Sequence, residues 1–373
     1  MKKVEQAAID TIRILSAEAV QKANSGHPGL PMGAAPMAYT LWAKNMNHNP
    51  KNPDWTNRDR FVLSAGHGSM LIYSLLHLFG YGLSMDDLKE FRQLGSLTPG
   101  HPEYGHTRGV ETTTGPLGQG VANAVGMAMA EAFMAAKFNK EDKKIVDHYT
   151  YALVGDGCMM EGIASEAASL AGTLKLGKLI VLYDSNNITI EGETDIAFTE
   201  DVRKRFEAYG WETILVEEGT DIDAINAAIQ LAKANKTKPT LIEIKTQIGH
   251  GSPAKQGKAS AHGEPLGVDN LLEAKKFLLH PEEEFHVPAE VRTHMDEIIN
   301  EGINKEKQWN RLFEEYEKEY PEEAKAWKAW HNGELPDFMN DENFWNLEKE
   351  IATRQASSDM INYIAKYVPN LIG

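Results

Sequence analysis

The chain of 373 residues has one cysteine, Cys158, and no continuous apolar segment that resembles a signal peptide or a membrane span. A single cysteine cannot form an internal disulfide, and this usage fits a reducing, cytoplasmic environment. Residues 1–10 mix charged and short apolar residues, so we expect no signal sequence there. No Cys-His signature accompanies Cys158, and we interpret it as a small residue of a helix turn rather than a catalytic thiol.

Basic residues are also scarce, with 38 Lys and Arg against 54 Asp and Glu and a net charge of -16. Nucleic acids and anionic membranes are bound mainly through clustered Lys and Arg, so we expect neither as a partner. The spacings H-E-x-x-H and C-x-x-C are missing as well, which disfavours a zinc site. A phosphorylated substrate would have to be met by local positive groups and by helix ends.

What the chain does contain is an alternation of apolar strands and amphipathic helices, typical of an α/β fold with a parallel sheet flanked by helices. The predicted strands are 61–64, 149–154, 179–183, 211–216 and 239–246. The predicted helices are 4–23, 33–42, 69–78, 121–136, 161–174, 198–209 and 223–234. With 42% hydrophobic residues the chain can bury a large core, and its length exceeds what one core usually supports.

The composition changes after Leu266. Acidic runs, which we expect on the solvated faces of helices, occupy 282–284, 314–319 and 322–323. We therefore divide the chain into an α/β domain at 1–267, a helical extension and linker at 268–350, and the start of a further unit at 351–373.

Two strand ends carry the clearest chemical signal. The strand at 149–154 runs into Gly-Asp-Gly at 155–157, and the strand at 179–183 ends shortly before Asn186. A helical pattern lies between them, and a strand-helix-strand unit requires parallel strands. Because parallel strands end at the same edge of a sheet, we expect Asp156 and Asn186 to lie side by side there.

The residues around Asp156 favour a metal-diphosphate anchor. Glycine on either side lets a ligand approach the backbone, and a helix that opens at Gly157 attracts a phosphate. The carboxylate would repel that phosphate unless a hard cation, Mg²⁺ or Ca²⁺, lay between them. Gly-Asp-Gly taken alone is more often an ordinary turn. Because it lies at one of two paired strand ends, we favour the metal-diphosphate anchor over the turn. The dinucleotide-binding fingerprint G-x-G-x-x-G would require a glycine at position 160, where this chain has Met160. Residues 172–178 resemble a P-loop, but they follow a predicted helix and precede a predicted strand, which is the wrong context for one.

Histidines recur next to glycines in the loops. The six with a glycine neighbour are His27, His67, His101, His106, His250 and His262. Glycine lets a ligand come close, and imidazoles around a sugar phosphate would suit proton transfer and hydrogen bonding to hydroxyls. Any one of them taken singly is equally well explained as an ordinary loop histidine.

Together these segments resemble transketolase. The stretch from Gly-Asp-Gly to Asn186-Asn187 resembles the thiamine diphosphate motif, which spans about thirty residues. Further segments that resemble the family, in that family's order, are 25–29, 64–68, 100–103, 112–120 and 261–263. The resemblance covers the chain from end to end.

The resemblance implies transfer of a two-carbon ketol unit from a ketose phosphate to an aldose phosphate, with thiamine diphosphate and Mg²⁺ or Ca²⁺ as cofactors. The implied metal ligands are Asp156, Asn186 and the carbonyl of Ile188. The implied cofactor contacts are His67, Gly115, Pro116, Leu117, Gly157, Glu161, Glu166, Asn186 and His262. The implied substrate contacts are His27, His101, His262 and Arg354, with His27 and His262 as candidate proton-transfer groups.

The family continues into a pyrimidine-binding domain, whose glutamate activates the cofactor, and a C-terminal domain, and this chain contains neither. We therefore expect 351–373 to be the truncated start of the pyrimidine-binding domain. We also expect the chain alone to be inactive, as part of a homodimeric, cytoplasmic enzyme. The alternatives are another thiamine enzyme, such as a deoxyxylulose phosphate synthase or a ketoacid dehydrogenase, and a non-catalytic cofactor-binding or assembly module. The histidine-bearing loops disfavour the other enzymes.

Overall fold

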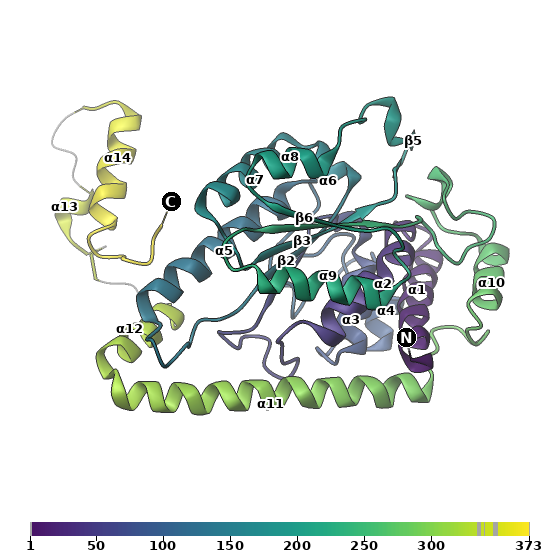
Figure 1. The fold of residues 1–373 in the computed structure, drawn as a ribbon, viewed down its shortest axis with the longest axis horizontal. Helices are drawn as coiled ribbons and strands as arrows, with labels where there is room; N and C mark the ends of the chain where they lie inside the picture. The colour runs from purple at the N-terminus through teal and green to yellow at the C-terminus, as the bar shows by residue number, and fades with distance from the viewer. Residues whose placement is uncertain (1, 334–336, 339, 346–349, 373) are drawn as a thin grey trace.

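The computed structural model describes residues 2–333, 337–338, 340–345 and 350–372. At its centre lies a five-stranded sheet in the order β1-β2-β3-β7-β6, with every neighbouring pair parallel (Figure 1). The strands are β1 (Arg60–Leu63), β2 (Thr150–Gly155), β3 (Leu179–Ser185), β6 (Glu212–Val216) and β7 (Thr240–Lys245). The predicted parallel α/β sheet is confirmed, and each predicted strand is present.

Helices cover both faces of this sheet (Figure 1). Helices α2 and α9 lie on one face, with α1 and α3 packed against α2, while α5 and α8 lie on the other face, with α7 packed against α5. The bounds are α1 (Lys3–Ala23), α2 (Gly29–Lys44), α3 (Met70–Leu78), α4 (Met85–Lys89), α5 (Gln119–Phe138), α6 (Asp156–Met160), α7 (Gly162–Leu174), α8 (Val202–Ala208) and α9 (Ile222–Ala234). Two short strands, β4 (Ile188–Thr189) and β5 (Gly192–Glu193), form a separate hairpin.

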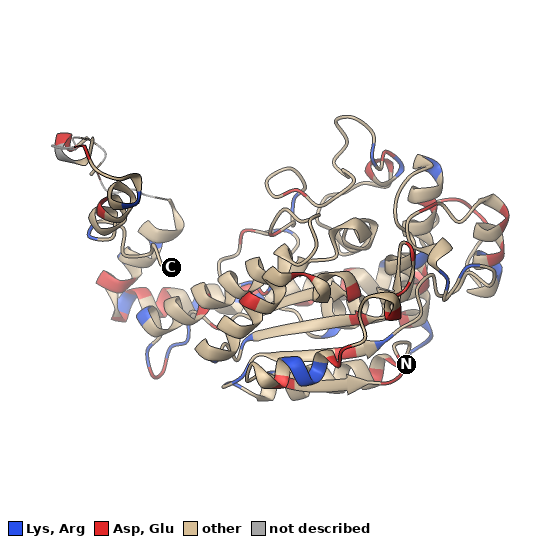
Figure 2. Cartoon of the chain, turned by 90° about the horizontal axis from the view of Figure 1, so that it is seen from above, with Lys and Arg blue, Asp and Glu red and all other residues tan. Residues whose placement is uncertain are grey.

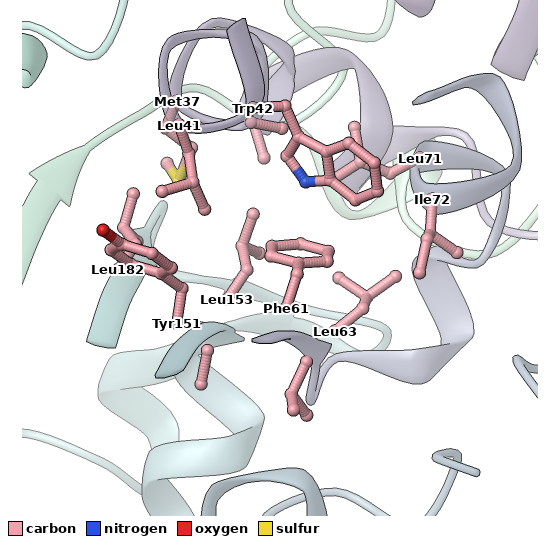
Figure 3. Packing of buried hydrophobic residues seen from close by; sticks show 14 of the residues in the cluster. Met37, Leu41, Trp42, Phe61, Leu63, Leu71, Ile72, Tyr151, Leu153 and Leu182 are labelled. Atoms are coloured by element: carbon pink, nitrogen blue, oxygen red, sulfur yellow. The ribbon is translucent and has the colours of Figure 1, made fainter. Parts of the chain in front are cut away.

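The core lies between α2 and the sheet. Side chains of α2, including Leu41 and Trp42, point onto Phe61 of β1 and Leu153 of β2 (Figure 3). Every residue of β2 and β3 is buried, because helices cover both faces of these central strands. Each large apolar side chain buried in this way contributes roughly 1.5–3 kcal/mol. This packing holds the strands, and hence their carboxyl ends, in one rigid arrangement.

The helix predicted over 161–174 is confirmed as α7, and the extended Glu161, with φ -78° and ψ 137°, separates it from the short helix α6 that precedes it. One sequence prediction needs correction. The acidic run 282–284 is not on a helix. It lies in the turns before α11, where the buried ammonium of Lys275 binds the carbonyls of Glu282 and Glu283 and pairs with Glu18.

The C-terminal part is helical. Its elements are α10 (Val268–Phe277), α11 (Ala289–Glu319), α12 (Pro321–His331), α13 (Glu342–Trp345) and α14 (Thr353–Ile364). Helix α11 runs along the body and packs on α1 and α12, whereas α14 stands apart and has no buried residue (Figure 1). No described helix is long and apolar enough to cross a membrane. Lys and Arg are interspersed with Asp and Glu over the described chain (Figure 2).

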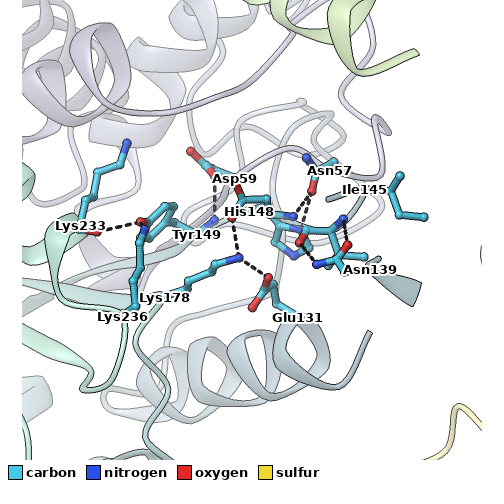
Figure 4. A network of polar contacts seen from close by, with 12 residues as sticks. Asn57, Asp59, Glu131, Asn139, Ile145, His148, Tyr149, Lys178, Lys233 and Lys236 are labelled. Atoms are coloured by element: carbon cyan, nitrogen blue, oxygen red, sulfur yellow. Dashed lines mark hydrogen bonds and ion pairs between the residues drawn. The ribbon is translucent and has the colours of Figure 1, made fainter. Parts of the chain in front are cut away.

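At the amino ends of the strands a polar network holds the sheet together (Figure 4). The buried carboxylate of Asp59 accepts hydrogen bonds from the backbone N–H groups of Asn47 and Tyr149, each at 2.7 Å. Burial raises the pKa of Asp59 to about 6, so it is ionised above neutral pH. Asp59 immediately precedes β1 and Tyr149 immediately precedes β2, so this carboxylate aligns the two strands.

Replacing Asp59 by Asn should therefore destabilise the chain at pH 7.5. The amide has one acceptor oxygen where the carboxylate has two, and a lost charge-assisted bond costs about 2 kcal/mol. The measurement is urea unfolding followed by circular dichroism, with Asp54→Asn, an exposed carboxylate nearby, as the matched control. Equal midpoints for the two variants would contradict the role of Asp59.

Candidate active site

A cavity of about 380 Å³ lies at the carboxyl edge of the sheet, beyond β2 and β3. Most of the residues singled out from the sequence line it, namely His27, His67, Gly115, Leu117, Asp156, Gly157, Glu161, Asn186, Ile188 and His262. The lining residues that sequence reasoning missed are Leu30, Ala65, Cys158, Met160, Thr189, Ile190 and Ile248. Several of these adjoin the recognised motifs, and, apart from Cys158 and Thr189, they have apolar side chains that carried no chemical signal.

Four predicted residues are not part of this lining. Pro116 and Glu166 are exposed, and His101 lines a neighbouring open groove instead. Arg354 is exposed on the first turn of α14, which stands apart from the cavity (Figure 1). The roles predicted for these four residues stay predictions.

Strand register brings Asp156 and Asn186 together. Gly155 of β2 pairs with Asp184 of β3, so the residues after each strand end emerge at the same level. One carboxylate oxygen of Asp156 accepts the backbone N–H of Asn187 at 2.9 Å and of Asn186 at 3.3 Å, and the other accepts the hydroxyl of Tyr183. Asn187 adopts a left-handed conformation, with φ 60°, in the turn that presents these N–H groups. Burial raises the pKa of Asp156 despite these bonds.

The amide of Asn186 is oriented by its own neighbours. Its Nδ2 donates to the carboxylate of Asp184 at 3.0 Å, and its Oδ1 accepts the N–H of Ile188 at 2.9 Å. Asp184 is fully buried, also accepts the hydroxyl of Thr246, and has its pKa raised to about 7 by burial. The amide oxygen is thereby turned toward the turn that starts β4. Sequence reasoning missed the parts played by Tyr183, which read as an ordinary strand residue, and by Asp184, which was placed just after a strand that in fact continues to Ser185.

Three histidines from separate loops meet across the cavity. The ring centroids of His67 and His262 are stacked at 5.1 Å, and His27 meets these rings edge-on at 5.1 and 5.7 Å. Burial, reinforced by the neighbouring histidines when they are protonated and for His27 also by Arg92, lowers the pKa of His27 to about 4 and of His67 to about 3, and burial lowers that of His262. The cavity therefore presents neutral imidazoles at neutral pH.

A glycine permits the loop of His262 to close over the cavity. A Cβ on Gly29, at the start of α2, would lie 2.5 Å from the carbonyl oxygen of Ala261, the residue before His262. Only glycine allows the backbone of α2 to approach this loop so closely. The same segment supplies His27, two residues before Gly29, so one close contact places two of the three imidazoles.

The residues present fit a metal-bound diphosphate cofactor. The carboxylate of Asp156 and the amide oxygen of Asn186 are hard oxygen donors of the kind that Mg²⁺ and Ca²⁺ prefer. The buried Nδ1 of His262 has no hydrogen-bond partner among the described residues, so a ligand atom can satisfy it. The described residues hold no cluster of three or more His, Cys, Asp or Glu side chains suited to a metal.

The fold and its cavity define a class, an α/β protein that binds its ligand beyond the carboxyl ends of a parallel sheet. Comparison with known families narrows this class, because residues 4–336 match the family described as "Transketolase, thiamine diphosphate binding domain". The chain belongs to the transketolase family.

Individual relatives agree. The chain is 56% identical to the transketolase of Halalkalibacterium halodurans over 374 residues, which are 100% of this chain and 56% of that protein. It is 57% identical to the transketolase of Geobacillus stearothermophilus, over 99% of this chain and 56% of that protein. A solved transketolase from Pichia stipitis, in complex with sedoheptulose-7-phosphate, superposes with a TM-score of 0.92 at 48% identity, over 99% of this chain and 55% of the other. The chain thus spans about half the length of the relatives that it matches.

The lowered imidazole pKa values predict that acid destabilises the fold. An unfolded histidine binds a proton below about pH 6.5, whereas His67 stays neutral in the folded chain down to about pH 3. The unfolded state then binds more protons within this window, so stability is lost as the pH falls from 6.5. In His67→Gln, unfolding at pH 5 should take up about one proton fewer, seen as a shallower pH dependence of the free energy of unfolding in urea. The exposed control His106→Gln should keep the wild-type slope, and an unchanged slope in His67→Gln would refute the assignment.

Proposed function

We propose that the whole protein transfers a two-carbon ketol unit from a ketose phosphate to an aldose phosphate, with thiamine diphosphate and Mg²⁺, or Ca²⁺, as cofactors. The observation that carries this proposal is the meeting of Asp156 and Asn186 at adjacent strand ends, inside a cavity lined by neutral imidazoles. Membership of the transketolase family supports it independently. The absence of a membrane-spanning helix from the described residues is compatible with the cytoplasmic location that we propose.

In this proposal Asp156, Asn186 and the carbonyl of Ile188 would hold the metal and, with it, the diphosphate of the cofactor. Thiamine diphosphate supplies the carbon nucleophile when it is bound. The side chains of Asp156 and Asn186 are already fixed by hydrogen bonds to their neighbours, so little ordering remains to oppose binding. His67, Gly115, Leu117, Gly157, Asn186 and His262 are proposed to contact the cofactor, with Pro116, Glu161 and Glu166 beside them.

The imidazoles are proposed to contact the sugar substrate and to exchange protons with it. His27, His101 and His262 contact the substrate, and His262 is suited to exchange a proton, because it is neutral and its Nδ1 has no partner. The half-buried guanidinium of Arg92 and, in the assembled protein, Arg354 supply positive charge for a phosphate. Since the chain as a whole is acidic, such local charges decide where an anionic substrate can bind.

The proposed partners are a second copy of the protein and the half that the relatives have in addition. Helix α7 exposes the apolar side chains of Ile163, Leu170 and Leu174, which supports contact with another protein surface there. We propose the domain division 1–267, 268–350 and 351–373, with the last segment as the start of the pyrimidine-binding domain. The glutamate that activates the cofactor in the family would come from that further domain.

Ketol transfer by the chain with and without its missing half tests the proposal. The 373-residue chain alone should give no transfer with saturating Mg²⁺ and thiamine diphosphate. Together with the segment by which the Halalkalibacterium halodurans relative extends beyond it, the chain should turn over at about 1 per second or more. His262→Ala should lower that turnover roughly 100-fold, whereas the control His286→Ala, a partly buried histidine outside the cavity, should not.

Inactivity of the complemented protein, with thiamine diphosphate bound, would favour a non-catalytic cofactor-binding module. Full turnover by the chain alone would show that the site is complete without the second half. Equal turnover in His262→Ala and His286→Ala would remove the proton-transfer role of His262.

A further inference from the structure

Arg92 lies between the cavity and the neighbouring groove, and no motif drew attention to it. Its Nη1 donates to the hydroxyl of Ser25 at 2.7 Å, and its Nη2 is 3.5 Å from Nδ1 of His27. Within the described chain no carboxylate lies at ion-pair distance from this guanidinium. Both terminal nitrogens of the Arg92 guanidinium are therefore directed at the loop that carries Ser25 and His27.

The surrounding backbone is built around this contact. Arg92 has a left-handed conformation, with φ 62°, and its N–H donates to the carbonyl of Thr98 at 3.0 Å. A Cβ on Gly100 would lie 3.3 Å from Nε of Arg92, and a Cβ on Gly26 would lie 2.8 Å from the ring of Phe91. A left-handed arginine is strained, and such strain persists only where the surrounding structure enforces it. The two loops are thus locked together with the guanidinium against His27.

In the contact between Arg92 and His27, the guanidinium can act only as the hydrogen-bond donor. A guanidinium has only donors, so the Nδ1 of His27 that faces it has to be the acceptor. A neutral imidazole that accepts at Nδ1 carries its proton on Nε2. We propose that Arg92 is a positioning residue that holds His27 as its Nε2–H tautomer, so that His27 meets the sugar as a hydrogen-bond donor and not as a base.

The charges around His27 favour the neutral ring that the proposal needs. The groups that face it are His67, His262, His101 and Arg92, all neutral or cationic. Burial lowers the pKa of His27 most, and the charges of His262, Arg92 and His101 lower it further, to about 4. At neutral pH the neutral imidazole of His27 therefore carries a single N–H proton, on either Nδ1 or Nε2. Arg92 faces Nδ1, which leaves Nε2 for the proton.

The proposal gives different roles to His27 and His262, which the sequence analysis treated alike as candidate proton-transfer groups. With Nδ1 engaged by Arg92, His27 has no free acceptor, whereas Nδ1 of His262 has no partner among the described residues. Proton acceptance then falls to His262, and His27 orients a sugar oxygen. This consequence rests on the proposed function, but the tautomer of His27 is a property of the chain itself and is measurable without substrate.

The test is two-bond ¹H–¹⁵N correlation NMR of the ¹⁵N-histidine-labelled 373-residue chain at pH 7, with His27→Gln identifying the signals of His27. The expected wild-type pattern is a protonated Nε2 and an unprotonated, hydrogen-bonded Nδ1. Arg92→Met, which has no donor, should move the tautomer ratio about tenfold toward Nδ1–H, the effect of one hydrogen bond from a charged group. Arg92→Lys should restore most of the wild-type ratio, and the exposed control Arg311→Met should leave it unchanged.

A wild-type His27 protonated on Nδ1, or an Arg92→Met ratio equal to wild type, would overturn the proposal. The wild-type measurement needs no substitution at Arg92, so it can still overturn the proposal if Arg92→Met folds poorly. Loss of ketol transfer in the complemented protein with the tautomer as expected would count against the proposed function alone.

Discussion

The site depends on the parallel register of β2 and β3. Because Gly155 is paired with Asp184, the turns that follow the two strands start at one level, and Asp156 receives two backbone N–H groups from the neighbouring turn. A slip of one residue would turn every side chain of a strand to the opposite face of the sheet. The buried packing of α2 on β1 and β2 resists such a slip, and Asp59 aligns the same strands at their other end.

Electrostatics support the cation that we propose at this site. The chain carries a net charge of -16, and the cavity holds a buried carboxylate beside imidazoles that are neutral at neutral pH. A diphosphate would enter such a site against repulsion from Asp156, with little compensating positive charge in the lining. A divalent ion reverses that balance, since it neutralises the carboxylate and attracts the phosphates together. The neutral imidazoles remain available for the uncharged part of the substrate.

The sequence predicted those parts of the structure that local patterns determine. Apolar strands alternating with helices predicted the parallel sheet, and the turn residues after two strands predicted that Asp156 and Asn186 would meet. The glycine neighbours pointed to six histidines as ligand contacts, of which His27, His67 and His262 line one cavity, while His101, His106 and His250 line other grooves. The parts that depend on tertiary contact escaped prediction. Tyr183 read as a strand residue, Asp184 as the first residue after the strand, and Arg92 reaches His27 only through the packing of two loops 65 residues apart. The position of Arg354 was implied by resemblance alone.

The central claim is that one cation links Asp156 and Asn186 to a diphosphate. Isothermal titration of thiamine diphosphate into the chain, with saturating Mg²⁺ and then with chelator, tests it most directly. The account predicts binding that is strongly weakened by the chelator and by Asp156→Asn, while Asp195→Asn, an exposed carboxylate close by in the sequence, behaves as wild type. Equal affinity with and without the cation, or equal affinity in the two variants, would contradict it.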